Sequence, residues 1–342
     1  MMRKIFFLFY TLFTSVPGFS QFLDFETTDF TKPDSIAALY ENFDLKDQQK
    51  LTSLLTKDLS SDVEKFRAIF KWIANNISYD IVLYDEKKKK EYQFKYKKRK
   101  LEKWKKGFDK RLLKRLIIGK ESICSGYSSL LETMCGFAGI TCEVISGYGR
   151  NELDRMGYGV IDHAWNAVFI NNKWYLSDPT WAAGYVNEDF NQFRKRFNKN
   201  YFLADPFFFA LDHYPKNPDW LLLTDKPTLK YFLNSPYKGE GFITNKLNHY
   251  KPTEGSIKLK GDSVITFAFT SNLPPDSLKK VSVDLYSKSK FSFKHFRSEV
   301  FPLKVDQEGY YNFNLILKEK GLIRIRIFIG RKLAFTYEVF SR

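Results

Sequence analysis

One cysteine and two later segments constrain this chain more than any other feature of its sequence. Cys124 is followed 39 residues later by His163, and then by Asp178. A thiol that opens a helix, a histidine on a strand and an aspartate on the next strand are, in that order, the parts of a Cys-His-Asp catalytic triad. The three residues lie in Ser122-Ile-Cys-Ser-Gly-Tyr127, Asp162-His-Ala-Trp-Asn166 and Tyr175-Leu-Ser-Asp-Pro-Thr-Trp181.

The position predicted for Cys124, at the start of a helix, would activate its thiol. A thiol at pH 7 is mostly protonated and remains a poor nucleophile until its pKa falls. The unpaired N–H groups and the dipole of a helix N-terminus lower that pKa, and an imidazolium beside the sulfur lowers it further. Gly126 leaves room for a substrate backbone, and the N–H of Cys124 could donate to a developing oxyanion.

The register of a predicted hairpin brings His163 and Asp178 together. Residues 163–170 and 173–178 are typical of strands, and Asn171-Asn172 between them is typical of a two-residue turn. With that turn, Asp178 is the diagonal neighbour of His163 on one face, with Cα atoms about 7–8 Å apart. A three-residue loop would instead place the two side chains on opposite faces.

Each of these residues, taken alone, has an ordinary structural explanation. A small cysteine is often buried in a helix, a strand histidine often belongs to the core, and an aspartate before proline often belongs to a turn. The ordered combination is what favours a triad.

These segments resemble the transglutaminase-like superfamily, a branch of the papain-type thiol enzymes. Within it they are most similar to the group that includes kyphoscoliosis peptidase and the cytokinesis-associated transglutaminase-like proteins. The Cys-to-His spacing is far shorter than in papain, which also favours this branch. The similar segments, which together cover roughly residues 60–225, are Phe66–Ile73, Ile77–Asp80, Cys124–Tyr127, Gly139–Gly147, His163–Asn166, Trp174–Trp181, Tyr201–Pro206 and His213–Pro215.

The resemblance implies an α+β, papain-like core in which a helix carries Cys124 and an antiparallel sheet carries His163 and Asp178. It implies that Cys124 is the nucleophile, His163 the base and acid, and Asp178 the residue that orients the imidazole. We interpret His213 as structural, and we expect neither a metal nor a cofactor. The walls of the substrate site are expected to be Tyr127, Trp165 and Trp181.

The function that follows is that of a transglutaminase-like thiol enzyme acting on amide bonds of a protein or peptide through a thioester. The acceptor of the acyl group, an amine or water, is left open by the sequence, as are the substrate, calcium dependence and the oligomeric state. The alternative is a non-catalytic binding or scaffold module that is located in the cell envelope or secreted. Such a module would combine the transglutaminase-like shell, a basic insertion and a β-sandwich.

The net charge of +16 is concentrated in one segment. Residues 87–120 hold 17 Lys and Arg against three acidic residues. We expect the insertion at 81–120 to form a solvated helical excursion. An anionic polymer or a membrane surface is the alternative role for residues 87–120, whereas no nucleic acid is expected as a partner of an exported protein.

The N-terminus is typical of a signal peptide. Arg3 and Lys4 precede an apolar stretch at residues 5–16, and small residues before Gln21 suit cleavage there. We therefore expect residues 1–20 to be removed and the protein to be periplasmic or secreted; the alternative is an uncleaved anchor. No cysteine lies near the cleavage site, so a lipoprotein is not expected.

The remaining length, about 320 residues, suggests two domains. We place a transglutaminase-like domain at residues 21–240, with the insertion at 81–120, and an all-β domain at 245–342. Short alternating apolar runs in the second part are typical of an immunoglobulin-like β-sandwich. The runs are Val264–Phe269, Val281–Leu285, Tyr311–Leu315, Ile323–Ile329 and Leu333–Val339.

Three cysteines are too few for a disulfide framework. Cys135 and Cys142 could form a single bridge in an exported protein, or could be two small buried apolar residues. No cysteine or histidine grouping has the spacing of a zinc site.

Overall fold

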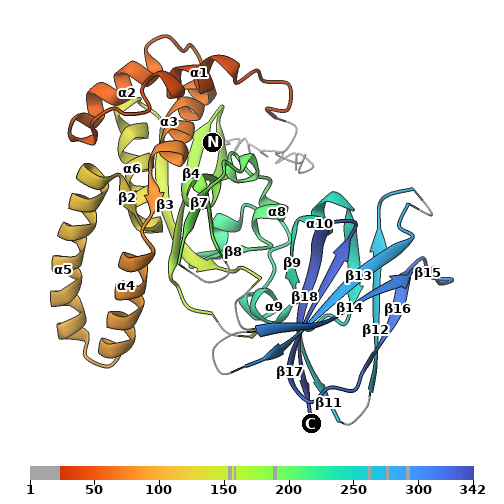
Figure 1. Cartoon of the computed structure of the whole chain (residues 1–342). Helices are drawn as coiled ribbons and strands as arrows, with labels where there is room; N and C mark the ends of the chain where they lie inside the picture. Colours follow the sequence, from red (N-terminus) through yellow and green to blue (C-terminus); the bar gives the residue numbers. More distant parts are fainter. Residues whose placement is uncertain are drawn as a thin grey trace, which may run out of the picture.

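The computed structural model describes residues 24–152, 156–157, 159–187, 191–260, 263–274, 277–289 and 293–342. The expected signal peptide at residues 1–20 lies outside these residues. Figure 1 shows helices and an antiparallel sheet in the first part of the chain, and a group of long strands in the second. No helix in the described ranges is long and apolar enough to cross a membrane.

The first part of the chain begins with helices that pack around α3. Its first turn has a capping box, in which Ser61 and Glu64 bond each other's backbone N–H groups. The apolar face predicted for this helix, which includes Phe66 and Phe70, is fully buried. The helices are α1 (Thr31–Leu39), the 3₁₀ turn η2 (Leu45–Asp47), α2 (Gln48–Thr56) and α3 (Asp62–Asn76).

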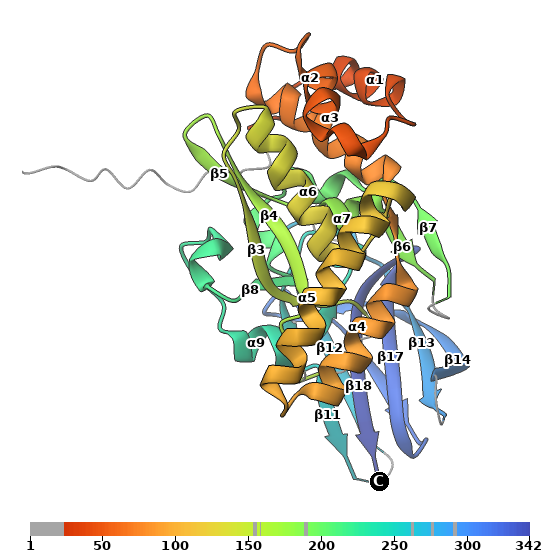
Figure 2. The same ribbon diagram turned by 90° about the vertical axis from the view of Figure 1, so that its left-hand side faces the viewer.

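The basic insertion is a helical hairpin, as the charge pattern indicates. Its two helices, α4 (Ile81–Phe94) and α5 (Lys98–Lys114), run side by side at the edge of the molecule (Figures 1 and 2). The strands β1 (Ser78–Tyr79) and β2 (Glu121–Ser122) pair in parallel, so the hairpin leaves and rejoins the core at neighbouring points. A π turn, η3 (Arg115–Gly119), precedes β2.

The central layer is α6 (Cys124–Phe137) against a four-stranded antiparallel sheet. Residues of β4 that point to opposite faces of the sheet belong to different hydrophobic clusters. Val168 packs with the helices on one face, whereas Trp165 packs with Phe209 on the other. The sheet has the order β5-β4-β3-β8, with β3 (Cys142–Gly149), β4 (His163–Ile170), β5 (Lys173–Ser177) and β8 (His213–Pro215). This arrangement confirms the expected mixture of helices with an antiparallel sheet.

The predicted hairpin turn and register are confirmed. Asn171 and Asn172 have φ of 51° and 61°, as a two-residue turn with two left-handed residues requires. The ladder pairs Ile170 with Lys173 and ends at Asn166 with Ser177. One detail was wrong: Asp178 is not a strand residue but the N-cap of α7 (Pro179–Ala183), because Pro179 cannot donate to a ladder and suits the first helical position.

Short elements lead from this layer to the second part of the chain. β9 pairs with β18, so the sheet of the second part already begins within the segment that we assigned to the first domain. The elements are β6 (Gly184–Val186), β7 (Phe193–Lys195), η4 (Lys199–Tyr201), α8 (Pro206–Phe209), η5 (Pro218–Leu221), α9 (Leu229–Asn234), β9 (Tyr237–Lys238) and α10 (Glu240–Thr244).

The second part consists of two sheets that share one hydrophobic cluster. One sheet has the order β10-β12-β16-β15, and the other β11-β18-β17-β13-β14. Each of the five predicted runs lies within a strand. The strands are β10 (Leu247–Lys251), β11 (Ser256–Leu259), β12 (Ser263–Ser271), β13 (Lys280–Lys288), β14 (Phe293–Pro302), β15 (Lys304–Val305), β16 (Tyr311–Leu317), β17 (Gly321–Ile329) and β18 (Lys332–Ser341).

Candidate active site

The structure brings together the three residues that the sequence singles out. His163 Nε2 lies 2.7 Å from Asp178 Oδ2, and the other side of the imidazole hydrogen-bonds the thiol of Cys124. Since Nε2 contacts the carboxylate, Nδ1 is the ring nitrogen left for the sulfur. The three side chains come from the start of α6, the start of β4 and the N-cap of α7.

The thiol of Cys124 is buried at the first position of α6, with the residue only 3% exposed. Sγ donates to the backbone oxygen of Asp162 at 3.6 Å. Burial raises the pKa of the Cys124 thiol, but the hydrogen bond and charge of His163 and the charge of Lys87 outweigh burial, and the pKa lies below its ordinary value. The thiolate is therefore the favoured form over a wider pH range than in a free cysteine.

His163 is held as an imidazolium. Burial alone would lower the pKa of His163, but the charge and hydrogen bond of Asp178, with a smaller contribution from Cys124, raise it to about 10. The two pKa shifts are in the directions that favour a thiolate–imidazolium pair over the neutral pair.

Asp178 is fully buried, and its orientation is set by four donors. Oδ1 accepts the backbone N–H groups of Thr180 at 2.7 Å and Trp181 at 3.1 Å. Oδ2 is shared by His163 at 2.7 Å and a second imidazole, that of His213, at 3.0 Å. Burial raises the pKa of Asp178, but the two histidines outweigh burial and hold that pKa far below its usual value.

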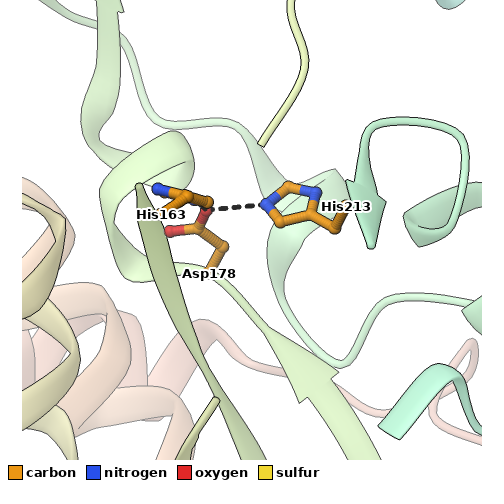
Figure 3. Close-up of side chains that lie close together, drawn as sticks. All are labelled: His163, Asp178 and His213. Atoms are coloured by element: carbon orange, nitrogen blue, oxygen red, sulfur yellow. Dashed lines mark hydrogen bonds and ion pairs between the residues drawn. The ribbon is translucent and has the colours of Figure 1, made fainter. Parts of the chain in front are cut away.

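His213, for which the sequence predicts a structural role, lies against the carboxylate of Asp178. Figure 3 shows it beside Asp178, with His163 also next to the carboxylate. Its other ring nitrogen, Nδ1, lies 2.5 Å from Asp212 Oδ1, and Asp212 Oδ2 accepts the hydroxyl of Tyr201 at 2.8 Å. A hydrogen-bonded chain thus runs from Cys124 to Tyr201. The only signal in the sequence is the His213-Tyr-Pro segment, because no local pattern reveals that β8 pairs with β3.

The three residues predicted as walls of the substrate site have different surroundings. Tyr127 is fully buried, and its hydroxyl donates to Ile77 O at 2.7 Å, so it belongs to the core rather than to a wall. Trp165 is also fully buried and packs edge-on against His213. Trp181 is partly exposed, with its ring centroid 5.3 Å from that of His163. Of the three, Trp181 fits a wall of the site in this conformation.

The basic hairpin reaches the site. Lys88 of α4 forms an ion pair with the carboxylate of Asp162, whose backbone oxygen accepts the thiol of Cys124. Tyr79, just before α4, is partly buried, and desolvation together with the charges of Cys124 and its other neighbours raises its pKa well above the ordinary value. The insertion is therefore part of the surroundings of the nucleophile.

His163, Asp178 and His213 are also the one group of described residues with donor atoms close enough to hold a metal ion. The same atoms already bond one another at 2.7 and 3.0 Å. A metal would have to break both hydrogen bonds of Oδ2, so the arrangement fits a buried hydrogen-bond network better than a metal centre.

The other two cysteines, Cys135 and Cys142, are free thiols in the structure, and both are buried. Burial and the hydrogen bond to Cys142 raise the pKa of the Cys135 thiol well above its usual value. Neither has the surroundings of a reactive thiol.

Comparison with known proteins finds similarity to one family. Residues 49–179, which include all three predicted triad residues, match the model of the transglutaminase-like superfamily. The chain is similar to kyphoscoliosis peptidase of Mus musculus, with 33% identity over 221 residues, which are 64% of this chain and 31% of that protein.

Two further relatives are similar over a longer part of the chain. Hillarin of Drosophila melanogaster is 25% identical over 262 residues, which are 72% of this chain and 30% of that protein. Lim and transglutaminase domain protein ltd-1 of Caenorhabditis elegans is 27% identical over 271 residues, which are 70% of this chain and 34% of that protein. The chain thus spans about a third of the length of the curated relatives it matches. Among solved structures, a superoxide reductase from Ignicoccus hospitalis aligns with 30% of this chain and 88% of its own at 18% identity, but its TM-score of 0.20 is too low to carry an argument.

Proposed function

Because this chain carries a domain of the transglutaminase-like superfamily, we propose that it is a thiol enzyme that acts on amide bonds of proteins or peptides through Cys124. The observation that carries the proposal is the hydrogen-bonded series Cys124–His163–Asp178, with the pKa of the thiol lowered and that of the imidazole raised. These are the directions that nucleophilic catalysis by a cysteine requires.

In the proposed first step, the thiolate of Cys124 attacks the carbonyl carbon of a carboxamide or peptide bond. The oxyanion that forms would be stabilised by N–H groups at the start of α6, such as that of Cys124. His163 then gives its proton to the departing nitrogen as the C–N bond breaks. The products of this step are a thioester on Cys124 and a free amine or ammonia.

In the second step, His163 takes a proton from the acceptor, which attacks the thioester carbonyl and releases the Cys124 thiolate. An amine acceptor gives a new amide, and water gives a carboxylate. Asp178 stays ionised throughout and stabilises the imidazolium. The geometry of the three side chains serves both acceptors equally.

The test is the rate at which iodoacetamide labels Cys124 in the native protein near pH 7. We expect the wild type to label much faster than the denatured chain, and His163→Ala to label slowly. Cys124→Ala measures the background from Cys135 and Cys142, which are buried. If the native wild type labels no faster than the denatured chain, the thiol is not activated and the proposal fails.

The two acceptors are separated by a second assay. A glutamine-containing protein such as casein is incubated with the enzyme and a fluorescent primary amine. Incorporation of the amine indicates acyl transfer, whereas new free carboxylates or peptide fragments indicate hydrolysis. Cys124→Ser should abolish either product.

We also infer that the C-terminal sandwich is immunoglobulin-like. In that fold, strands A, B, E and D form one sheet, and C, F and G the other. The order β10-β12-β16-β15 follows A-B-E-D, and β18-β17-β13 follows G-F-C. The parallel pairing of β11 with β18 further supports an extension of strand A onto the second sheet.

Export of the protein remains part of the proposal, supported by the charged and apolar N-terminal pattern of residues 1–20. N-terminal sequencing of the protein recovered from the periplasm or medium should begin at Gln21. Recovery only from the cytosol, beginning at residue 1 or 2, would contradict it.

A second candidate function is suggested by the hairpin of α4 and α5. Its segment carries 17 basic and three acidic residues, and most of these side chains are exposed or partly exposed. The alternative is therefore a binding module in which this hairpin binds an anionic polymer or a membrane surface. Binding to heparin or anionic vesicles should weaken steeply with salt and be lost when the lysines at 97, 98, 100 and 103 are replaced by glutamine. If Cys124→Ala keeps full biological function while this variant loses it, binding is the primary role.

A further inference from the structure

A cavity of about 710 Å³ lies along the segment that joins the two parts of the chain. It is within the size range of small-molecule sites, roughly 300–1,000 Å³. Aromatic rings from α9, α10 and β10 line it, namely Tyr231, Phe232, Phe242 and Tyr250. None of its lining residues belongs to the Cys124 site.

The cavity contains one buried ammonium group. Lys238 is only 7% exposed, and its Nζ lies 5.1 Å from the ring centre of Tyr250, 5.3 Å from that of Tyr231 and 6.0 Å from that of Phe242. Nζ can donate three hydrogen bonds, and the structure supplies one, to Ser235 Oγ at 3.2 Å. Within the described ranges, no carboxylate lies at ion-pair distance from Lys238.

A second buried cation lies beside the first. Arg150 is 4% exposed and donates to the backbone oxygens of Ser235 and Phe232, each at 2.5 Å. Ser235 thus accepts hydrogen bonds from both cations, from Lys238 at its hydroxyl and from Arg150 at its backbone oxygen. Burial and the charge of Arg150 lower the pKa of Lys238 to about 7. The three aromatic faces do not replace a counterion, since a buried charge is stabilised mainly by an opposite charge and by hydrogen bonds.

We propose that this cavity binds a carboxylate attached to an apolar body, with the carboxylate on Lys238 and the body against Phe242 and Tyr250. A carboxylate would supply the acceptors that Nζ lacks and would remove the repulsion between two buried cations. The aromatic walls would bury an apolar group of similar size. The carboxylate can come from a free organic acid or from the C-terminus of a peptide, and the two sources share this chemistry.

The rim of the cavity is consistent with such an anion. The lining at the rim includes three exposed residues, Asp225, Lys226 and His249. The carboxylate of Asp225 is therefore in contact with water. Lys226 pairs with Asp219, outside the cavity lining. The buried end of the cavity, by contrast, carries the positive charge of Lys238.

The test is isothermal titration calorimetry of the full chain with 3-phenylpropanoate and with its neutral amide, 3-phenylpropanamide. We expect the acid to bind and the amide to bind at least about tenfold more weakly, as loss of a charged hydrogen bond implies. Equal binding of the two compounds, or no binding of the acid at millimolar concentration, would overturn the proposal. Because both ligands are compared on the wild type, the result does not depend on a variant that folds.

A matched pair of variants locates the site. Lys238→Met should weaken binding of the acid by about tenfold or more. Lys230→Met, at an exposed position of α9 outside the lining, should leave it unchanged. Both variants should keep the wild-type labelling rate of Cys124, which separates this proposal from the proposed catalysis. An unchanged affinity in a folded Lys238→Met protein would place the acid elsewhere and refute the assignment.

The two sources of carboxylate are distinguished with a short peptide that ends in phenylalanine, prepared with a free or an amidated C-terminus. Tighter binding of the free-carboxylate peptide than of 3-phenylpropanoate indicates a peptide terminus. Binding of 3-phenylpropanoate alone indicates a small organic acid.

Discussion

At the scale of single residues, Asp178 controls the pKa of the imidazole that lies beside Cys124. It is buried without access to water, yet it accepts four hydrogen bonds and faces two imidazoles. These donors stabilise its ionised form, and the ionised form in turn raises the pKa of His163 to about 10. The lowered pKa of Cys124 depends on the imidazolium that results. The ionisation of all three groups is thus coupled.

Replacing Asp178 by asparagine keeps the shape of the side chain and removes its negative charge. The pKa of His163 should then fall from about 10 toward its ordinary value, and that of Cys124 should rise. We expect labelling of Cys124 by iodoacetamide at pH 7 to slow by at least about tenfold, the factor for one pKa unit. The pH at which labelling reaches half its maximal rate should move upward, whereas Asp219→Asn, an exposed control, should not move it.

His213 is expected to act as a positioning residue through Asp178. Its hydrogen bond and charge help to hold the pKa of that carboxyl low, so His213→Phe should raise the pKa of Asp178. As pH falls, Asp178 is then protonated earlier, and the labelling rate of Cys124 should fall at a higher pH than in the wild type. His213→Gln keeps a donor and should restore part of the shift. A purely structural role would change stability but leave the pH profile in place.

At the scale of secondary-structure elements, the basic hairpin is joined to the central layer next to Cys124. The small apolar cluster of Leu83, Phe108 and Ile123 anchors α4 and α5 to the segment before α6. The ion pair of Lys88 with Asp162 adds a contact on the far side of Cys124. Because Cys124 is only 3% exposed, we expect these contacts of the hairpin to limit how a reagent reaches its thiol.

Lys88→Met should make Cys124 easier to reach by removing this contact. A partly exposed ion pair contributes up to ~1 kcal/mol, which corresponds to a factor of about five. We therefore expect labelling by a bulky maleimide to accelerate by up to about fivefold. Lys89→Met removes the same charge from an exposed neighbouring position and is the control. Equal rates in the two variants would show that the ion pair does not restrict access.

At the scale of the whole molecule, the two parts of the chain are connected by more than a linker. Lys238 of β9 pairs with Phe335 of β18, so a strand from before the expected boundary completes the second sheet. Arg326 of β17 also forms an ion pair at 2.9 Å with Glu152, which follows β3. These contacts indicate that the second part supports the segment that lines the cavity and follows His213.

Truncation after residue 240 should therefore destabilise the remaining protein, although the cut falls at the boundary that composition suggests. It removes β18 and the hydrophobic cluster of the second part, against which Leu211 packs in the complete chain. We expect a lower melting temperature and binding of a hydrophobic dye, measured against the full chain. A truncated protein that melts at the same temperature would show that the first part folds independently.

The sequence by itself determined those features that depend on neighbours along the chain. The capping box of Ser61 and Glu64 and the Asn171-Asn172 turn with its register follow from local rules of helix ends and two-residue turns. The alternating runs of the second part likewise marked five of its strands. Because the register depends on the turn alone, the nearness of His163 and Asp178 could be predicted without a structure.

The tertiary structure alone decided which distant groups join the site. Only the pairing of β3 with β8 places His213 against Asp178, and only the return of the basic hairpin beside the sheet places Lys88 against Asp162. Tyr127 lies three residues after Cys124 on α6. Its side chain faces the core because the packing of α6 decides which face of the helix is buried. These outcomes depend on long-range packing, whose free energy comes from contacts between segments that carry no mutual signal in the sequence.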